Sequence, residues 1–589
     1  MDPPGRFEKL PPHSSAPEGD LAHTSDMPRS PLAALLPAAL LPGLCLLSGC
    51  TQSFYKRWAD REVFGIIGNK SQVVAGTDET LLDITPPPPA KLDALEKSRN
   101  NSDFLGERAF IEKNARMLGL ADALDFAVHR NRGYLGRKET VYLSALRLTL
   151  TRQQFGPVAD GGGGVFYTER QVKNGVNDFV RTSTLTTDGI VGFDYLMRTG
   201  ARLAMDLSTD FTRFFTGATP KLSDSRAAAT LSQPLLRGAG VLAASEPLRQ
   251  DEREVLYAIR DFTQFRKQFT VDTARQYLRV LQAREAARNR NTAYRAAILS
   301  LERERALADA NLRSQSSLRQ IEQGLLSYER SRITAIRNYE DQLDDLKIAL
   351  GLPVTERIVL DNKEIENLQV IDPSGTLDEA QDTALITRLD LFNERDRLQD
   401  AARKVKIAHQ NTLPGVNALV NYEIGTPGGN EGLELNHRQR RLTAGLDVDL
   451  NLNTKPERNV LRSSQITEQR SARELELAEE NLRGNIRADW RALEVARQQY
   501  DLAVEGLALA EKRLEIEEAL MAEGQGTARD IVESQDRLIA ARDLVVSSKI
   551  DHVIARLQLW SDMGILFIQK DGRWADVLKN EKNQGTEEE

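Results

Sequence analysis

The residues of this chain that could do chemistry are few, and the most suggestive are two acids in its last quarter. Asp530 and Glu533 are three positions apart at the start of an expected helix, so both carboxylates lie on one helical face. Repeated around an aqueous bore, such carboxylates form a charged ring that selects cations and binds polyvalent ones. The alternative interpretation is that they are helix N-terminal acids, stabilised by the helix dipole with or without a bore.

Catalytic and metal-binding patterns are not visible in the sequence. The six histidines lie far apart without ligand spacing, so we expect no metal site. No Ser–His–Asp or Cys–His arrangement is apparent. The run Gly161–Gly164 lacks the Lys-Ser/Thr of a phosphate-binding loop, and we interpret it as a flexible loop in an irregular stretch, 155–200. We therefore expect no enzyme and no cofactor, and the net charge of −8 argues against a nucleic-acid partner.

The N-terminal region has the features of a lipoprotein signal. Residues 31–49 are apolar, contain three prolines and fall short of a spanning helix, which is typical of a signal peptide. The sequence Leu47-Ser48-Gly49-Cys50 follows and resembles a bacterial lipobox. That resemblance implies that Cys50 is diacylated and begins the mature chain, and two acyl chains give a firm membrane anchor. Thr51, where an inner-membrane lipoprotein typically has Asp, favours the outer membrane, and Met27 is the hypothesised true start.

The elements that must position these residues are mainly long helices. Aromatic residues make up only 6% of the chain and charged residues 28%, a composition typical of long helices. Residues 246–310 and 459–523 each read as one continuous helix, about 98 Å long at 1.5 Å per residue. In the second, large residues such as Leu493 and small ones such as Ala496 recur every seven positions, which favours close packing of neighbouring helices.

An internal duplication organises the chain. Residues 301–351 align without a gap on 514–564, with Gly351 matching Gly564. A repeated unit that buries its heptad-patterned helix faces against further copies of itself implies a closed array. The expected segments are a leader and signal peptide at 1–49, a lipidated tether at 50–117 with Pro86–Pro89 as an extended spacer, a first repeat at 118–352, a connector at 353–376, a second repeat at 377–568 and a polar tail at 569–589.

Four short segments alternate apolar and polar residues, as strands with two different faces do. They lie at 203–211, 226–234, 416–424 and 446–452. In the last, Leu446, Val448 and Leu450 are expected to point outward, and Asp447 and Asp449 inward. Such segments on a lipid-anchored chain favour a transmembrane β-barrel. Because four strands cannot close a barrel of useful bore, the interpretation requires an oligomer.

Two motifs carry a resemblance to a known family. The first is Ser232-Gln233-Pro234-Leu235-Leu236-Arg237-Gly238-Ala239-Gly240, in which Pro234 ends a strand and Gly238 and Gly240 let the chain turn. The second runs from Gly524 and Gly526 to Asp530-Ile531-Val532-Glu533. Over residues 118–568 the sequence resembles the TolC-like outer-membrane efflux channel family, lipoprotein branch, and the motifs match its strand–helix junction and the tip of its last helical hairpin.

The resemblance implies a fold and a role. The fold is mostly α with a small antiparallel β part: a homotrimer in which duplicated strand and long-helix repeats form an α-barrel tunnel, joined to a twelve-stranded β-barrel with four strands from each chain. The role is a passive conduit of a tripartite efflux or type I secretion system in the outer membrane of a Gram-negative bacterium. Its partners are outer-membrane lipid, a periplasmic adaptor (membrane fusion) protein and an inner-membrane transporter.

The resemblance also places Asp530 and Glu533 at the tunnel-entrance constriction. Gly526 stands where some members have a gate arginine, so a closing latch would differ here. The alternative function is a lipid-anchored coiled-coil scaffold or adhesin without a pore. The alternating strands discriminate between the two, because a scaffold has no use for them.

Overall fold

The computed structural model describes the chain from Thr51 to Trp574 with short gaps. The described residues are 51–77, 82–85, 92, 95–97, 103–174, 178–215, 221–310, 314–373, 375–426, 435–523 and 525–574. Cys50, Gly524 and Pro86–Pro89 therefore lie outside them. The chain divides into two units after Asp60, within helix α2 (Gln52–Ser71), and the second unit begins at Arg61.

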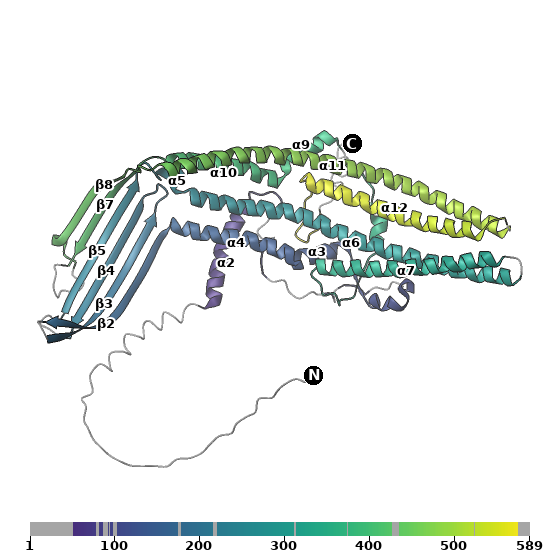
Figure 1. The fold of residues 1–589 in the computed structure, drawn as a ribbon, viewed down its shortest axis with the longest axis horizontal. Helices are drawn as coiled ribbons and strands as arrows, with labels where there is room; N and C mark the ends of the chain where they lie inside the picture. The colour runs from purple at the N-terminus through teal and green to yellow at the C-terminus, as the bar shows by residue number, and fades with distance from the viewer. Residues whose placement is uncertain are drawn as a thin grey trace, which may run out of the picture. The chain divides into compact units, whose positions relative to one another are not determined.

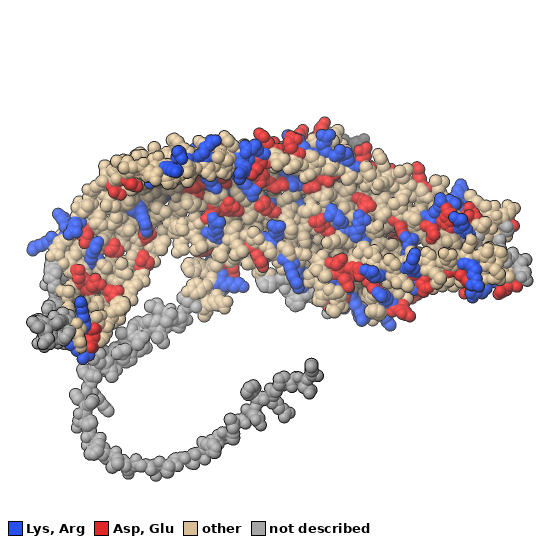
Figure 2. Space-filling model, viewed as in Figure 1, with Lys and Arg blue, Asp and Glu red and all other residues tan. Residues whose placement is uncertain are grey.

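Two very long helices dominate this unit (Figure 1). Helices α6 (Glu246–Asp309) and α11 (Lys455–Ala522) have 64 and 68 residues, and confirm the two long helices predicted from the sequence. Each is followed by a helix that packs back along it, α7 (Gln315–Ala349) after α6 and α12 (Ala528–Asp562) after α11. In α11 the seam residues Ile486, Leu493, Ala496 and Ala503 are buried, as the heptad pattern predicts. In Figure 2, basic and acidic side chains are interspersed along the visible face of the helices.

The two halves of the chain repeat one order of elements. Helices α3 (Leu120–Arg130) and α4 (Arg132–Gln154) open the first half, and α9 (Leu377–Thr387) and α10 (Leu389–Gln410) open the second. Strands and then a long helical pair follow in each half. The shorter elements are η4 (Asp103–Ile111), β1 (Arg116–Leu118), α5 (Gly240–Ala244), β6 (Ile358–Leu360), α8 (Lys363–Asn367) and η5 (His437–Gln439), with β1 paired to β6 in parallel.

Two glycines show the duplication at atomic level. Gly351 and Gly564 follow α7 and α12 with φ of 69° and 75°, conformations that favour glycine. A Cβ on Gly351 would lie 2.5 Å from the carbonyl oxygen of Arg130, the last residue of α3. A Cβ on Gly564 would lie 2.8 Å from the hydroxyl of Thr387, the last residue of α9. Each long hairpin therefore ends against the equivalent short helix of its own half.

A six-stranded sheet lies beyond one end of the long helices (Figure 1). Its order is β2 (Pro157–Asn174), β3 (Asp178–Leu196), β4 (Arg202–Phe214), β5 (Lys221–Pro234), β7 (Gly415–Gly425), β8 (Arg440–Asp449), and every neighbouring pair is antiparallel. The last four are the strands expected from alternation. Strand β8 ends at Asp449, opposite the first residue of β7, so Leu450 and Leu452 lie beyond the ladder rather than in it.

Two expectations about this sheet are wrong. The run Gly161–Gly164 is not a flexible loop but part of β2, within a stretch that contains β2 and β3, and the chain supplies six strands to the sheet rather than four. Glycines have low strand propensity, which hid β2 from a reading of the sequence. In the structure they allow close approach of the neighbouring strand, since a Cβ on Gly163 would lie 2.8 Å from the carbonyl oxygen of Asp188.

The sheet has one apolar and one polar face, and the strand register defines both. The apolar face carries Leu203, Met205, Leu207, Phe211, Ala227, Ala229, Leu231, Val416, Ala418, Val420, Tyr422, Ile424, Leu442, Ala444, Leu446 and Val448. Asp206, Asp210, Arg226, Glu423, Asp447 and Asp449 are among those on the other face. Leu446 and Val448 therefore lie on one face of the sheet and Asp447 and Asp449 on the other, and which face points outward stays a prediction. Leu446 is 67% and Val448 53% exposed within the chain, so the apolar face is uncovered.

Part of the expected tether belongs to the folded body. Val63, Ile66 and Ile67 of α2 are buried in one cluster with Tyr134 and Val141 of α4. This packing was hard to predict because the prolines that follow at 86–89 favour an extended spacer.

The two hairpin-end glycines generate a prediction for stability. Gly351→Ala and Gly564→Ala each combine a left-handed backbone with a steric clash, so each is expected to lower the free energy of unfolding by about 2–4 kcal/mol. The matched control is Gly506→Ala in α11, whose Cβ would meet nothing within 4 Å. In a helix interior that change should gain about 0.5–1 kcal/mol. Urea unfolding measures all three, and equal stabilities would contradict the packing described.

Candidate functional site

The tip between α11 and α12 is a tight turn. The amides of Gln525 and Gly526 both donate to the carbonyl oxygen of Leu520, at 2.9 and 3.0 Å. A Cβ on Gly526 would lie 2.8 Å from the backbone nitrogen of Met521. The turn therefore requires glycine at 526 because the chain folds back onto the last turn of α11. Gly524, the other glycine predicted for the tip, lies outside the described residues.

Asp530 is part of the N-terminal cap of α12. Thr527 is the N-cap residue, and its hydroxyl oxygen accepts a hydrogen bond from the Asp530 amide at 3.3 Å. The same hydroxyl donates to the Asp530 carboxylate. The carboxylate thus lies at the positive end of the helix dipole, as the alternative interpretation of this residue required. This cap leaves the side chain at the exposed tip, so both roles remain compatible with its position.

Glu533 lies one helical turn further along and is paired with basic groups. Its carboxylate contacts the guanidinium of Arg537 at 2.5 Å and lies 3.9 Å from that of Arg513 on α11. Two guanidinium groups therefore offset its charge, whereas the carboxylate of Asp530 is bonded to the Thr527 hydroxyl. The sequence reading missed both arginines. Arg537 was detectable from its spacing of four, whereas Arg513 required the register of the hairpin.

The first turns of α12 are held against the other hairpin. The Tyr328 hydroxyl on α7 donates to the carbonyl oxygen of Val532 at 3.2 Å. Beside it, Gly324 faces Val532, and a Cβ there would lie 3.5 Å from the Val532 side chain, in ordinary van der Waals contact. Burial, reinforced by nearby Asp536, raises the pKa of Tyr328, so the hydroxyl keeps its proton and remains a donor. Any movement of this tip away from α7 must break this bond.

The predicted strand–helix junction lies between β5 and α5. Pro234 is the last residue of β5, Gly238 has a φ of 72°, and Gly240, the first residue of α5, has a φ of 84°. The side-chain amide of Gln233 donates to the carbonyl oxygen of Pro234 at 2.7 Å. Gln410, at the end of α10, donates to the carbonyl oxygens of the turn at Leu236 and Ala239. The turn is therefore fixed by residues from both halves of the chain.

A cluster of charged side chains connects three helices of the second half of the chain, α10, α11 and α12. Arg388, just before α10, pairs with Asp390 at 2.6 Å and with Asp562 at the end of α12 at 2.8 Å. Burial and the neighbouring Asp562 raise the pKa of Asp489, on α11, to about 7. Because these groups come from three helices, their proximity could not be read from spacing in the sequence.

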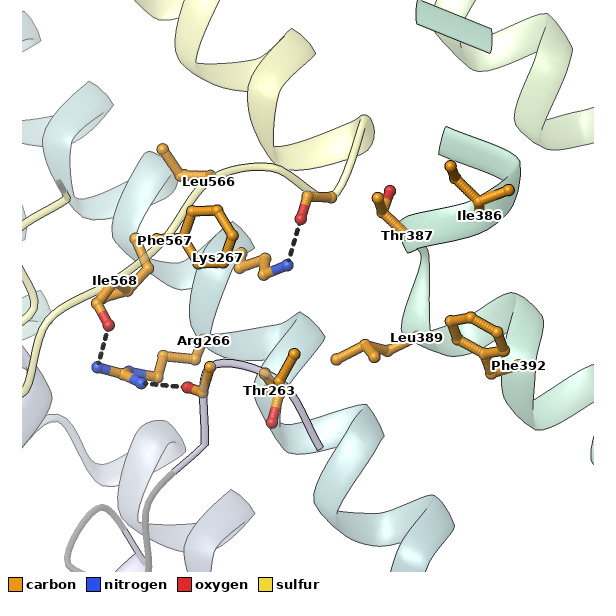
Figure 3. Close-up of a pocket in the computed structure, with 13 residues that line it drawn as sticks. Thr263, Arg266, Lys267, Ile386, Thr387, Leu389, Phe392, Leu566, Phe567 and Ile568 are labelled. Atoms are coloured by element: carbon orange, nitrogen blue, oxygen red, sulfur yellow. Dashed lines mark hydrogen bonds between the residues drawn. The ribbon is translucent and has the colours of Figure 1, made fainter. Parts of the chain in front are cut away.

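A cavity of about 220 Å³ lies where the end of α12 meets α6 and α9 (Figure 3). Arg266 donates to the carbonyl oxygens of Gly76 at 3.4 Å and Ile568 at 2.9 Å, and Lys267 to that of Gly564 at 2.7 Å. Burial lowers the pKa of Lys267 to about 8. Both cationic side chains donate to backbone carbonyl groups of the chain, so we interpret the cavity as part of a packed junction rather than as a ligand site.

The described residues hold no group of three or more His, Cys, Asp or Glu side chains arranged for a metal ion. Among the helices described, none has a stretch both long and apolar enough to cross a membrane. Cys50, the predicted lipid site, lies outside the described part of the chain.

Comparison with known proteins rests on structure. No protein-family model and no curated protein matches the sequence. CmeC of Campylobacter jejuni, an outer membrane channel, is 16% identical, with 85% of this chain and 96% of that chain covered and a TM-score of 0.55. MtrE of Neisseria gonorrhoeae, solved in the open state of its outer membrane channel, is 14% identical over 77% and 90% of the two chains, with a TM-score of 0.56.

The chain has the TolC-like fold. CusC, studied for transmembrane channel formation, agrees with this at a TM-score of 0.55, with 14% identity over 76% of this chain and 92% of its own. The TolC-like fold predicted from the two sequence motifs is therefore confirmed, as is a mostly helical chain with an antiparallel sheet.

The cluster around Asp489 predicts how stability depends on pH. The folded state holds this proton up to a pH of about 7, whereas an ordinary Asp loses it near pH 4. Between these values the folded state binds more protons, so stability falls as the pH rises. After allowance for partial exposure we expect a loss of about 1–2 kcal/mol between about pH 5 and 8.

Asp489→Asn should remove this loss, while Asp501→Asn on the exposed face of the same helix should keep it. Urea unfolding at several pH values provides the measurement. An Asp489→Asn protein with the pH dependence of the parent would show that another group is responsible.

Proposed function

We propose that the chain is one subunit of a trimeric outer-membrane channel, a passive conduit of a tripartite efflux or type I secretion system. The observation that supports this best is the sheet with an uncovered apolar face, joined directly to helical hairpins of about 100 Å. An apolar face with a polar reverse is the arrangement of a barrel wall between lipid and an aqueous lumen. The likeness in fold to CmeC and MtrE, both outer membrane channels, supports the same role.

The proposed partners follow from this role. The helical tip at Gly526 would meet a periplasmic adaptor (membrane fusion) protein, and an inner-membrane transporter would supply the substrate and the energy. The chain itself would bind no nucleic acid, need no cofactor and catalyse no reaction. The alternative, a lipid-anchored coiled-coil scaffold or adhesin, is disfavoured because the apolar side chains of the sheet would then be exposed to water.

The anchor is proposed to be a lipid on Cys50. Cys50→Ser should abolish both acylation and processing, because the sulfur is the acyl acceptor and the residue defines the cleavage point. Mass spectrometry of the mature N-terminus and incorporation of labelled palmitate are the measurements. Channel assembly should survive in part, since the strands can insert without the lipid. Palmitate that still enters the Cys50→Ser protein would contradict the proposal.

The gate proposal is that Asp530 and Glu533 line the tunnel entrance. The double change Asp530→Ala, Glu533→Ala should weaken block by polyvalent cations roughly fivefold or more, since one charge pair at about 4 Å is worth about 1 kcal/mol in water. Because Glu533 is paired with Arg537, the single change Asp530→Ala should account for most of the effect. Single-channel recording in planar bilayers is the measurement, and the trimer should remain intact.

A matched control is Glu505→Ala, which removes an exposed acid elsewhere on α11. Conductance with unchanged cation block in the double variant would leave the two acids a helix-capping role only. Absence of conductance from every variant and from the parent would instead favour the scaffold.

A further inference from the structure

The hairpin of β2 and β3 adds two strands to the edge of the sheet beyond β4. Strand β3 pairs with β4 along thirteen residues, from Thr184 opposite Phe214 to Leu196 opposite Arg202. Strand β2 pairs with β3 along its whole length. The outer edge of β4 is therefore occupied by the chain's own hairpin and is not available to another copy in this structure.

The hairpin continues the two faces of the sheet in register. On the apolar face, Val191 and Phe193 lie opposite Leu207 and Met205 of β4. On the polar face, Asp188 and Asp194 lie in the same ladder as the acids of β4, although Ile190 and Phe166 also lie there. From Pro157 to Tyr167 every residue of β2 on the apolar face is uncharged: Pro157, Ala159, Gly161, Gly163, Val165 and Tyr167. A hairpin that packed outside the sheet would not need apolar and polar faces in register with those of β4.

The ends of the sheet are β2 and β8, and neither has a second partner strand among the described residues. Inside a bilayer the backbone groups of an open edge have no water to bond, so a barrel must close. Because the six strands alternate in direction, β8 runs antiparallel to β2. The β8 edge of one copy and the β2 edge of another can therefore form an ordinary antiparallel pair.

We propose that the β2–β3 hairpin is part of the barrel wall, so that each chain contributes six strands and β2 pairs with β8 of a second copy. This rests on the proposed trimeric channel. Three copies of a six-stranded sheet close a barrel of eighteen strands. Barrel diameter grows roughly linearly with strand number, so the lumen is about 1.5 times as wide as that of a twelve-stranded barrel.

Cysteine cross-linking in membranes tests which strand meets β8. The sequence has only Cys45 and Cys50, neither of them in the sheet, so engineered pairs have little background. One series joins Ala444→Cys in β8 with a cysteine in β2, at Ala159, Gly161, Gly163 or Val165. The competing series joins Ala444→Cys with a cysteine in β4, at Leu203, Met205 or Leu207. Covalent multimers are scored by gel migration after oxidation.

Multimers from the β2 series and none from the β4 series are expected. Multimers from the β4 series alone would show that the hairpin lies outside the wall, which overturns this inference and leaves the proposed channel standing. Multimers from neither series would show that copies do not pair through their sheets, which contradicts the channel itself. The two failures are thus distinguishable.

A second measurement asks whether the hairpin faces lipid. Val191→Arg places a charge on the apolar face of β3, and Val448→Arg does the same on β8. Thr186→Arg is the matched control on the polar face of β3. Recovery of trimer from membranes should fall at least tenfold for both valine variants and less than twofold for Thr186→Arg. If Val191→Arg is tolerated as well as Thr186→Arg while Val448→Arg is not, the hairpin does not contact lipid and the inference fails.

Discussion

A sheet with one apolar face and two open edges cannot persist alone, and the rest of this structure depends on that constraint. In water the apolar face that carries Leu446 and Val448 would be exposed and would associate with other apolar surfaces. In a bilayer its edge strands would leave backbone groups without partners. Closure with other copies meets both requirements, and it also gathers the helices that leave the sheet into a ring. The proposed oligomer would therefore follow first from the need to pair the backbone groups of the edge strands, and only then from helix packing.

The helical part repeats one design twice, and in the proposed assembly it would extend the closed sheet into a long conduit. In each half a long helix carries the chain away from the sheet and a shorter helix returns it, ending at Gly351 or Gly564 against a short helix. Charged side chains then join these elements at mid-length, with Arg388 linking α10 to the end of α12. Far from the sheet, the hydrogen bond from Tyr328 to Val532 ties one hairpin to the other. In the proposed channel, opening at the tip would have to break this bond.

Much of this fold could be predicted from the sequence because its signals are periodic. Heptads such as Leu493 with Ala496 indicate the helices, and strict alternation indicates β4, β5, β7 and β8. Strand β2 could not be found this way, since the run Gly161–Gly164 removes side chains from both faces. In β3 the alternation is broken because Thr187 and Gly189 lie on the apolar face and Ile190 on the polar one. At the tip, Asp530 and Glu533 were identifiable, but Arg513 was not, because only the fold of the hairpin brings it near.

The central claim is that copies of this chain close into one β-barrel continuous with a helical tunnel. Electron cryomicroscopy of the assembly extracted from outer membranes tests it most directly. The account predicts a threefold-symmetric particle whose β-barrel has an apolar outer surface and carries Asp447 on its inner wall. A monomeric particle, or an elongated helical bundle with no lumen, would contradict it.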